Sequence, residues 1–213
     1  MEIHISKADL QGYDKIKRLN IVNSVSGVKP ANLIGTQSEK GQTNLAIFSS
    51  VVHIGSNPAL LGMFSRPDAE IRRDTLENIK ESGYYTINHV PTKLIENAHF
   101  TSAKFNSAES EFDKCQFTPF WQDEFQAPYV KESPLKIGLQ FKSAIPIPIN
   151  GTLLIIGAIQ HIYLADNALA EDGQIDLSQL QTAGISGLNR YYELSFLQEF
   201  PYARPNQLPD FKK

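Results

Sequence analysis

The sequence contains little of what marks disulfide-bonded, nucleic-acid-binding or membrane proteins. One cysteine, Cys115, occurs among 213 residues, which excludes an internal disulfide and a multi-cysteine metal site and fits a reducing compartment. The formal net charge is -3 and basic residues cluster only at 15–18, so we expect no nucleic-acid partner. No apolar run approaches the roughly 20 residues of a membrane-spanning helix, and the start lacks a secretion signal. We therefore expect a cytoplasmic protein with no membrane partner.

Arrangements of side chains that catalyse by themselves are also missing. The histidines and acidic residues are scattered, without the spacing of zinc ligands, a carboxylate pair or a Ser/His/Asp triad. We therefore expect no metal site. The chain does have an ordinary globular composition, with 41% hydrophobic and 20% charged residues, and its length fits one sizeable domain.

Short β-branched and aromatic runs separated by turn residues predict a mainly β protein. Strands are expected at residues 19–25, 31–36, 44–48, 59–64, 84–90, 135–149 and 152–164. The proline-rich run 135–149 is typical of an edge strand, whereas 152–164 has the length and composition of a central strand. Asn150-Gly151 predicts a hairpin turn with positive φ at both residues. Helices are expected at 74–83 and 92–97. Many strands and few helices favour a closed or nearly closed antiparallel barrel.

The start of the helix at 74–83 has features of an anion-binding site. We expect Asp74 to be its N-cap, and the free N–H groups of the first turn would attract a phosphate. Thr75 would add a hydroxyl donor, and Arg72 or Arg73 a positive charge. The alternative is that the two arginines form an ordinary solvated surface.

Ser49 and Ser50 follow the strand 44–48 directly. Small hydroxyl residues at a strand end can approach a ligand whose apolar face lies along the sheet. The alternative is that they simply terminate the strand.

Residues 100–134 are rich in aromatic side chains but have no sustained period, which predicts loops and short helices. The large aromatic residues there are Phe100, Phe105, Phe112, Phe117, Phe120, Trp121, Phe125 and Tyr129. We expect these rings to cover a flat ligand or a partner subunit.

Several short motifs occur together in a distinctive order. They are PANLIGT at 30–36, NLAIFS at 44–49, NPALL at 57–61, RDTLENI at 73–79, GYYTIN at 83–88, ESPL at 132–135 and LIIGAI at 154–159. In order and spacing they resemble the flavin reductase-like family, which has the FMN-binding split β-barrel fold, antiparallel and Greek-key-like. The resemblance covers about 28–193, so we expect residues 1–213 to form a single domain with N-terminal and C-terminal extensions around that core.

The resemblance implies FMN held at a homodimer interface. The flavin ring would lie along the strand after Asn44, and the phosphate near the two serines and the start of the helix. The residues implied to bind FMN are Asn44, Phe48, Ser49, Ser50, Val51, Arg66, Arg73, Asp74 and Thr75, with Arg72 a further candidate.

The resemblance also implies an oxidoreductase that passes electrons from NADH or NADPH through FMN to an unknown acceptor. No catalytic residue is required beyond the flavin, although His53 or His161 could approach it; both could equally be packed histidines. Relatives that use nicotinamide often carry Gly-Asp-His where this chain has Asn150-Gly151-Thr152. The alternatives are therefore an FMN-binding carrier or sensing module without steady turnover, and a structural barrel with an empty site.

Overall fold

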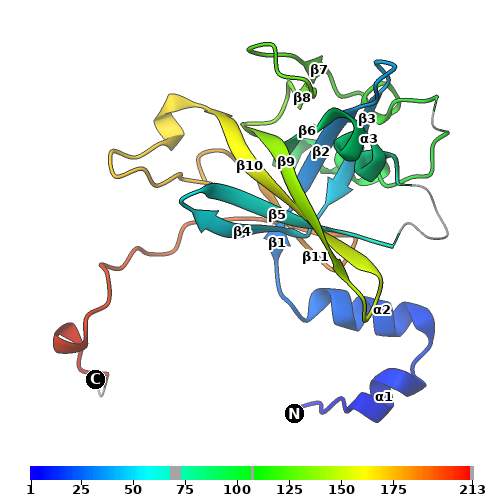
Figure 1. Ribbon diagram of the computed structural model, residues 1–213. Coiled ribbons are helices and arrows are strands. Elements are labelled where there is room, and N and C mark those ends of the chain that lie inside the picture. Colours follow the sequence, from blue (N-terminus) through cyan, green and yellow to red (C-terminus); the bar gives the residue numbers. More distant parts are fainter. Residues whose placement is uncertain (68–72, 107, 212–213) are drawn as a thin grey trace.

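The computed structural model describes residues 1–67, 73–106 and 108–211. Within these residues the main sheet has seven strands in the order β3-β2-β6-β9-β10-β5-β4, and its paired strands are antiparallel (Figure 1). Its strands are β2 (Asn32–Gln37), β3 (Thr43–Phe48), β4 (Val51–Ser56), β5 (Ala59–Ser65), β6 (Tyr84–His89), β9 (Leu135–Ile147) and β10 (Thr152–Leu164). Smaller sheets pair β1 (Lys29–Pro30), β11 (Ala183–Ser186) and β12 (Arg190–Glu193), and β7 (Pro119–Phe120) with β8 (Tyr129–Val130). The predicted mainly β, antiparallel split barrel is confirmed.

The two edge strands of the main sheet follow each other in the chain. β3 lies at one edge and β4 at the other, and only Ser49 and Ser50 connect them. The sheet must therefore curl until its edges meet at these two serines. This point, which we call the closure corner, is where the barrel closes.

The central position of β10 is confirmed, but the prediction that 135–149 is an edge strand is wrong. β9 pairs with β10 along its whole length and with β6 from Lys136 to Gln140. The one proline of β9, Pro146, lies in its second half, which continues past the end of β6, and Pro148 follows the strand. Proline is tolerated there because no strand on that side needs its missing N–H.

The predicted turn at Asn150-Gly151 also differs. Ile147 pairs with Thr152, so four residues form the connection instead of two. Gly151 has a φ of 71° and Asn150 does not share the positive φ. The Asn150 Oδ1 instead accepts hydrogen bonds from the backbone N–H and the hydroxyl of Thr152, at 3.1 and 2.7 Å. The side chain of Asn150 thus shapes the turn.

The strand expected at 19–25 is a helix. α1 (Lys7–Gly12) and α2 (Lys15–Ser24) precede the barrel, and the Asp14 carboxylate caps α2 by accepting the N–H groups of Ile16 and Lys17 at 2.9 and 3.0 Å. A local cap decides the structure here because the segment stands away from the sheets that could pair with it (Figure 1).

The helix α3 (Asp74–Ser82) forms as predicted and ends at Gly83 in the left-handed conformation, with a φ of 74°. Its N-cap is Arg73 and not Asp74, which is the first helical residue. The other predicted helix, 92–97, divides into a 3-10 turn (Thr92–Leu94) and α4 (Ile95–Phe100). Leu76 and Ile79 turn the apolar side of α3 into the barrel.

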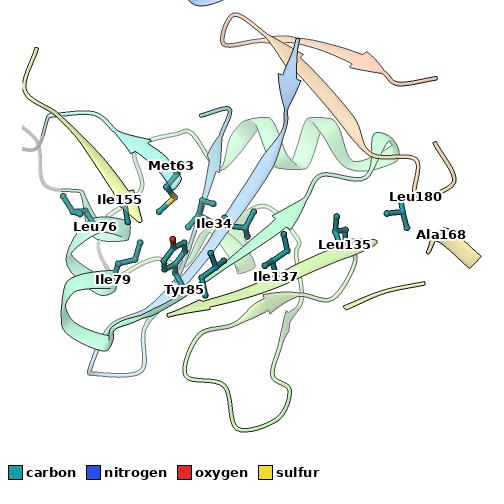
Figure 2. Packing of buried hydrophobic residues seen from close by; sticks show 12 residues of the cluster. Ile34, Met63, Leu76, Ile79, Tyr85, Leu135, Ile137, Ile155, Ala168 and Leu180 are labelled. Carbon is teal, nitrogen blue, oxygen red and sulfur yellow. The ribbon is translucent and has the colours of Figure 1, made fainter. Parts of the chain in front are cut away.

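The main core fills the barrel between β2, β5, β6, β9, β10 and α3. Its buried residues are Ile34, Met63, Leu76, Ile79, Tyr85, Ile87, Leu135, Ile137, Leu139, Ile155, Ala168 and Leu180. Tyr85 is fully buried among Met63, Ile79 and Ile155 (Figure 2). Its hydroxyl has no hydrogen-bond partner among the described residues, and burial raises the pKa of Tyr85 well above the usual range.

The aromatic segment 100–134 packs largely inside its own chain. Phe112, Phe117, Phe125 and Tyr129 are buried, while Phe100 and Trp121 are 57% and 44% exposed. The short helix α5 (Glu111–Lys114) holds Phe112 in a second core cluster with β2 and β3. The four buried rings therefore pack against their own chain and do not cover a partner subunit or a ligand.

Among the helices of the described residues, none is both long and apolar enough to span a membrane.

Candidate functional site

The closure corner is held by hydrogen bonds of Ser50. Its hydroxyl donates to the Phe64 carbonyl at 2.9 Å and accepts the Phe64 N–H at 3.2 Å. Ser50 therefore completes the β4–β5 ladder with its side chain, and its hydroxyl is engaged in the fold. Ser49 beside it is half-buried, and its hydroxyl makes no hydrogen bond to the described residues.

Two arginines flank this corner. Arg66 directly follows β5 and is exposed. Arg73 lies at the start of α3, where its Nε donates to the Pro67 carbonyl at 3.4 Å. Among the described residues, nothing bonds to the terminal nitrogens of the guanidinium, which can donate to an anion. The remaining candidate arginine, Arg72, lies outside the described residues.

Thr75 and Asn44 form a polar network beneath the start of α3. The Asn44 Nδ2 donates to the Thr75 Oγ1 at 3.0 Å and lies 3.3 Å from the Thr36 Oγ1, which also accepts the Asn78 Nδ2 at 3.1 Å. Thr75 is only 8% exposed. These residues fasten α3 to β2 and β3, and the Thr75 hydroxyl faces protein more than solvent.

Asp74 lies on the other side of the helix start, in an acidic hollow of about 560 Å³. The hollow is lined by Ser38, Glu39, Lys40, Gln42, Thr43, Asn44, Asp74, Asn78, Glu81, Asn106, Ala108, Glu109 and Glu111. Its five carboxylates face one lysine, so the hollow repels a phosphate. The arginine side of the helix start is the one suited to an anion.

The outer edge of β3 is partly covered by α5. The Glu111 carboxylate accepts the Leu45 N–H at 2.9 Å, and the hydroxyls of Thr43 and Ser110 lie 2.7 Å apart. Burial raises the pKa of Glu111, and the nearby charge of Asp74 adds to the effect. A ring lying along β3 would therefore meet the strand beyond Leu45, toward Phe48. Phe48 and Val51 are half-buried and pack against the main core on either side of the serines.

Of the two candidate histidines, His161 lies away from the closure corner. His53 is exposed on β4. His161 lies eight residues along β10 from Leu153, which pairs with Ser65 beside Arg66. At about 3.3 Å per residue, that separation is roughly 26 Å along the strand. A ligand anchored at the corner of one chain is therefore far from the His161 of that chain.

His161 instead belongs to an aromatic group that the sequence analysis did not identify. Its ring packs edge-on to Phe125 with centroids 5.5 Å apart and lies parallel to that of Tyr163 at 6.0 Å. The Tyr163 hydroxyl donates to the Asp123 carboxylate, and burial raises the pKa of Tyr163 to about 12. Only the alternation of His161 and Tyr163 on one strand hinted at this arrangement. Asp123 and Phe125 come from a loop whose position the sequence does not reveal.

Across residues 1–67, 73–106 and 108–211, no group of three or more histidine, cysteine or acidic side chains is placed to hold a metal ion.

Comparisons with known proteins agree with this geometry. Residues 28–180 match the family model of the flavin reductase like domain. A crystal structure described as a candidate flavin reductase with a split barrel domain, from Shewanella frigidimarina, is 46% identical; the match covers 95% of this chain and 100% of that chain, with a TM-score of 0.90.

Two further matches are more distant. Nitrilotriacetate monooxygenase component B from Bacillus cereus is 20% identical over 94% of this chain and 99% of that chain, with a TM-score of 0.82. An uncharacterized Aquifex aeolicus protein is 25% identical over 79% of this chain and 85% of its own length.

Proposed function

The chain belongs to the flavin reductase-like family, and from this we propose that it is an FMN-dependent oxidoreductase that takes electrons from NADH or NADPH and passes them to a second acceptor. The observation that carries the proposal is the closure corner. There Ser49 lies between the two edge strands of the barrel sheet, Arg66 directly follows β5, and Arg73 at the start of α3 contacts Pro67, all within the matched region 28–180.

The groups at this corner fit the phosphate end of FMN. Two guanidinium groups and one accessible hydroxyl supply charge-assisted and neutral donors, which is the set that a phosphate needs. Asn44, Ser50 and Thr75 have their side chains in hydrogen bonds of the fold, so they shape the corner. In this proposal Ser49, Arg66 and Arg73 bind the phosphate, while Phe48 and Val51 give the ring an apolar surface.

When bound, FMN supplies the hydride and electron chemistry, and the protein supplies binding, orientation and exclusion of water. The packed core behind Phe48 and Val51 keeps water from one side of the site. The fixed start of α3 keeps Arg73 in position, because four polar side chains fasten that helix to β2 and β3.

The first test is binding. The protein is titrated with FMN and, separately, with riboflavin, which lacks the phosphate, and binding is followed by quenching of flavin fluorescence. If the corner holds the phosphate, FMN should bind at least about tenfold more tightly than riboflavin, since one charge-assisted hydrogen bond contributes about 1.5–3 kcal/mol. Equal affinities would contradict the assignment of the corner, and no binding of either flavin would contradict the proposed function.

The second test is turnover. The FMN-loaded protein is mixed anaerobically with NADH or NADPH in a stopped-flow instrument, and bleaching of the flavin absorbance is recorded. Bleaching that saturates with nucleotide concentration supports the oxidoreductase. Tight FMN binding without bleaching by either nucleotide would favour the flavin carrier, the alternative suggested by the absence of Gly-Asp-His at 150–152.

A further inference from the structure

The chain ends in an arm that its own barrel leaves uncovered. Every residue from Ser195 to Phe211 is exposed, and Figure 1 shows this C-terminal arm extending away from the barrel after β12. Its short 3-10 turn (Pro205–Gln207) is closed by a hydrogen bond within the arm, from the Gln207 N–H to the Arg204 carbonyl at 2.9 Å.

The arm is far more apolar than a solvated tail. Six large side chains on it are 67% exposed or more: Phe196, Leu197, Phe200, Tyr202, Leu208 and Phe211. Together they leave on the order of 900 Å² of mostly apolar surface in water, taking about 200 Å² for each full side chain. A specific protein interface removes about 800 Å² from each partner. The arm alone is therefore large enough to form one side of a stable interface.

A matching surface lies on the outside of the barrel. Val52 and Ile54 on β4, Phe64 on β5 and Ile145 on β9 are 36–49% exposed. Phe64 and Ile145 both pair in register with Leu154 of β10, so the three residues form one row on one face of the sheet. We call Val52, Ile54, Phe64 and Ile145 the outer patch.

The arm is also matched in a second protein. The Shewanella frigidimarina structure matches 95% of this chain at a TM-score of 0.90. The 5% of 213 residues left outside the match is about 11 residues, fewer than the 17 from Ser195 to Phe211. At least part of the arm is therefore matched in a chain that differs at more than half of its positions.

We propose that the C-terminal arm binds the outer patch of a second copy of this chain, so that two copies clasp each other reciprocally. The arm and the patch are both apolar and occur on one chain, which makes the contact self-complementary under a twofold axis and doubles the buried area. The homodimer expected from the sequence thereby gains a structural basis, in place of the aromatic segment 100–134. The inference does not depend on flavin binding.

The test uses the full chain without flavin. Light scattering should give about twice the 23.8 kDa of one chain. The triple variant Phe196→Ser, Phe200→Ser and Tyr202→Ser should have a dimer dissociation constant at least about hundredfold higher, because three large apolar side chains leave the interface. Ile149→Ser is the matched control: Ile149 is 97% exposed at the tip of the β9–β10 turn, outside both arm and patch. A monomeric parent, or an unchanged dimer in the triple variant, would overturn the proposal.

A cross-linking experiment identifies the contact itself. Chains carrying Tyr202→Cys are mixed with chains carrying Val52→Cys and treated with a short bismaleimide; Cys115 is buried and common to all samples. Cross-linked pairs in this mixture can form only between chains. We expect them with Val52→Cys and few with Ile149→Cys in its place. Equal yields from both mixtures would overturn the proposal. A chain that carries both Tyr202→Cys and Val52→Cys gives the second check: if it cross-links only within itself and the mixture does not cross-link, the arm lies on its own barrel and the proposal is overturned.

Discussion

Asn44 on β3 donates a hydrogen bond to the Thr75 hydroxyl on α3 at 3.0 Å, across a junction between residues 31 positions apart in the chain. Both residues were predicted to bind FMN, and Thr75 was predicted to contact its phosphate. Thr75 accepts this bond and is almost fully buried, whereas the contact of the neighbouring Arg73 to Pro67 is long and exposed, so Arg73 is better placed to bind an anion. The two neighbours should therefore behave differently on mutation.

Arg73→Ala should weaken FMN binding by about ten- to hundredfold, because it removes a charge-assisted hydrogen bond to the phosphate. Its effect on riboflavin should be within about twofold, since riboflavin offers no phosphate. Fluorescence titration with both flavins measures the difference. Arg190→Ala, on the exposed end of β12, is the matched control. An equal loss for both flavins would show that Arg73 acts on the structure and not on the phosphate.

Thr75→Val keeps the volume of the side chain but deprives the Asn44 Nδ2 of its acceptor. We expect a loss of about 1–2 kcal/mol in the free energy of unfolding, with FMN affinity changed by less than about threefold. Urea denaturation and flavin titration of the same preparation separate the two effects. A large loss of affinity at unchanged stability would return Thr75 to the binding site.

Tyr85→Phe should leave the protein as stable as the parent or stabilise it by about 1 kcal/mol. The change removes a buried hydroxyl that lacks a partner among the described residues. Gly157→Ala should instead cost about 1–3 kcal/mol, since its Cβ would collide with the Tyr85 hydroxyl and approach its Cζ to 2.9 Å. The double variant should recover part of that loss. Strict additivity in urea denaturation would show that the two residues do not meet.

His89 should make the fold sensitive to acid. Burial lowers the pKa of His89 to about 4 from an ordinary 6.5, so the unfolded chain binds a proton more readily between these values. Stability should therefore be complete above pH 6.5 and fall as the pH drops toward 4. Because the ring is half-buried, we expect a loss of about 1–2 kcal/mol from pH 7.5 to pH 5. His89→Gln should flatten this dependence in urea denaturation; an unchanged slope would assign it to other groups.

His161→Ala should change the FMN dissociation constant by less than about twofold, because His161 lies at the far end of β10 from Arg73. The four-residue β9–β10 turn offers no imidazole, so we expect reduction of the bound flavin by NADH to be slow. If His161 of a second copy seats the nicotinamide, the variant should abolish that reduction in stopped-flow measurements. Fast, saturable reduction in both proteins would show that neither the turn nor His161 matters.

The barrel was predictable because its strands carry their own signals: β-branched runs, turn residues and a left-handed glycine after α3. The segment 19–25 was not, since its apolar residues fit a strand or a helix, and the Asp14 cap settles the matter only where no sheet is near. At the site, the sequence indicated that Ser49 and Arg73 could bind a phosphate, and this stays a prediction. The sequence could not indicate that the Thr75 hydroxyl is bonded within the fold, because that bond comes from Asn44 on another strand.

The strand order has a consequence for how quickly the chain can reach this structure. Neighbours such as β2 with β3, β4 with β5 and β9 with β10 are hairpins that can form within microseconds. β5 must then find β10, and Gly62 pairs with Ile156 across more than ninety residues of chain. Such distant pairing has a high contact order, so the pairing of β5 with β10 favours a folding time of milliseconds to seconds.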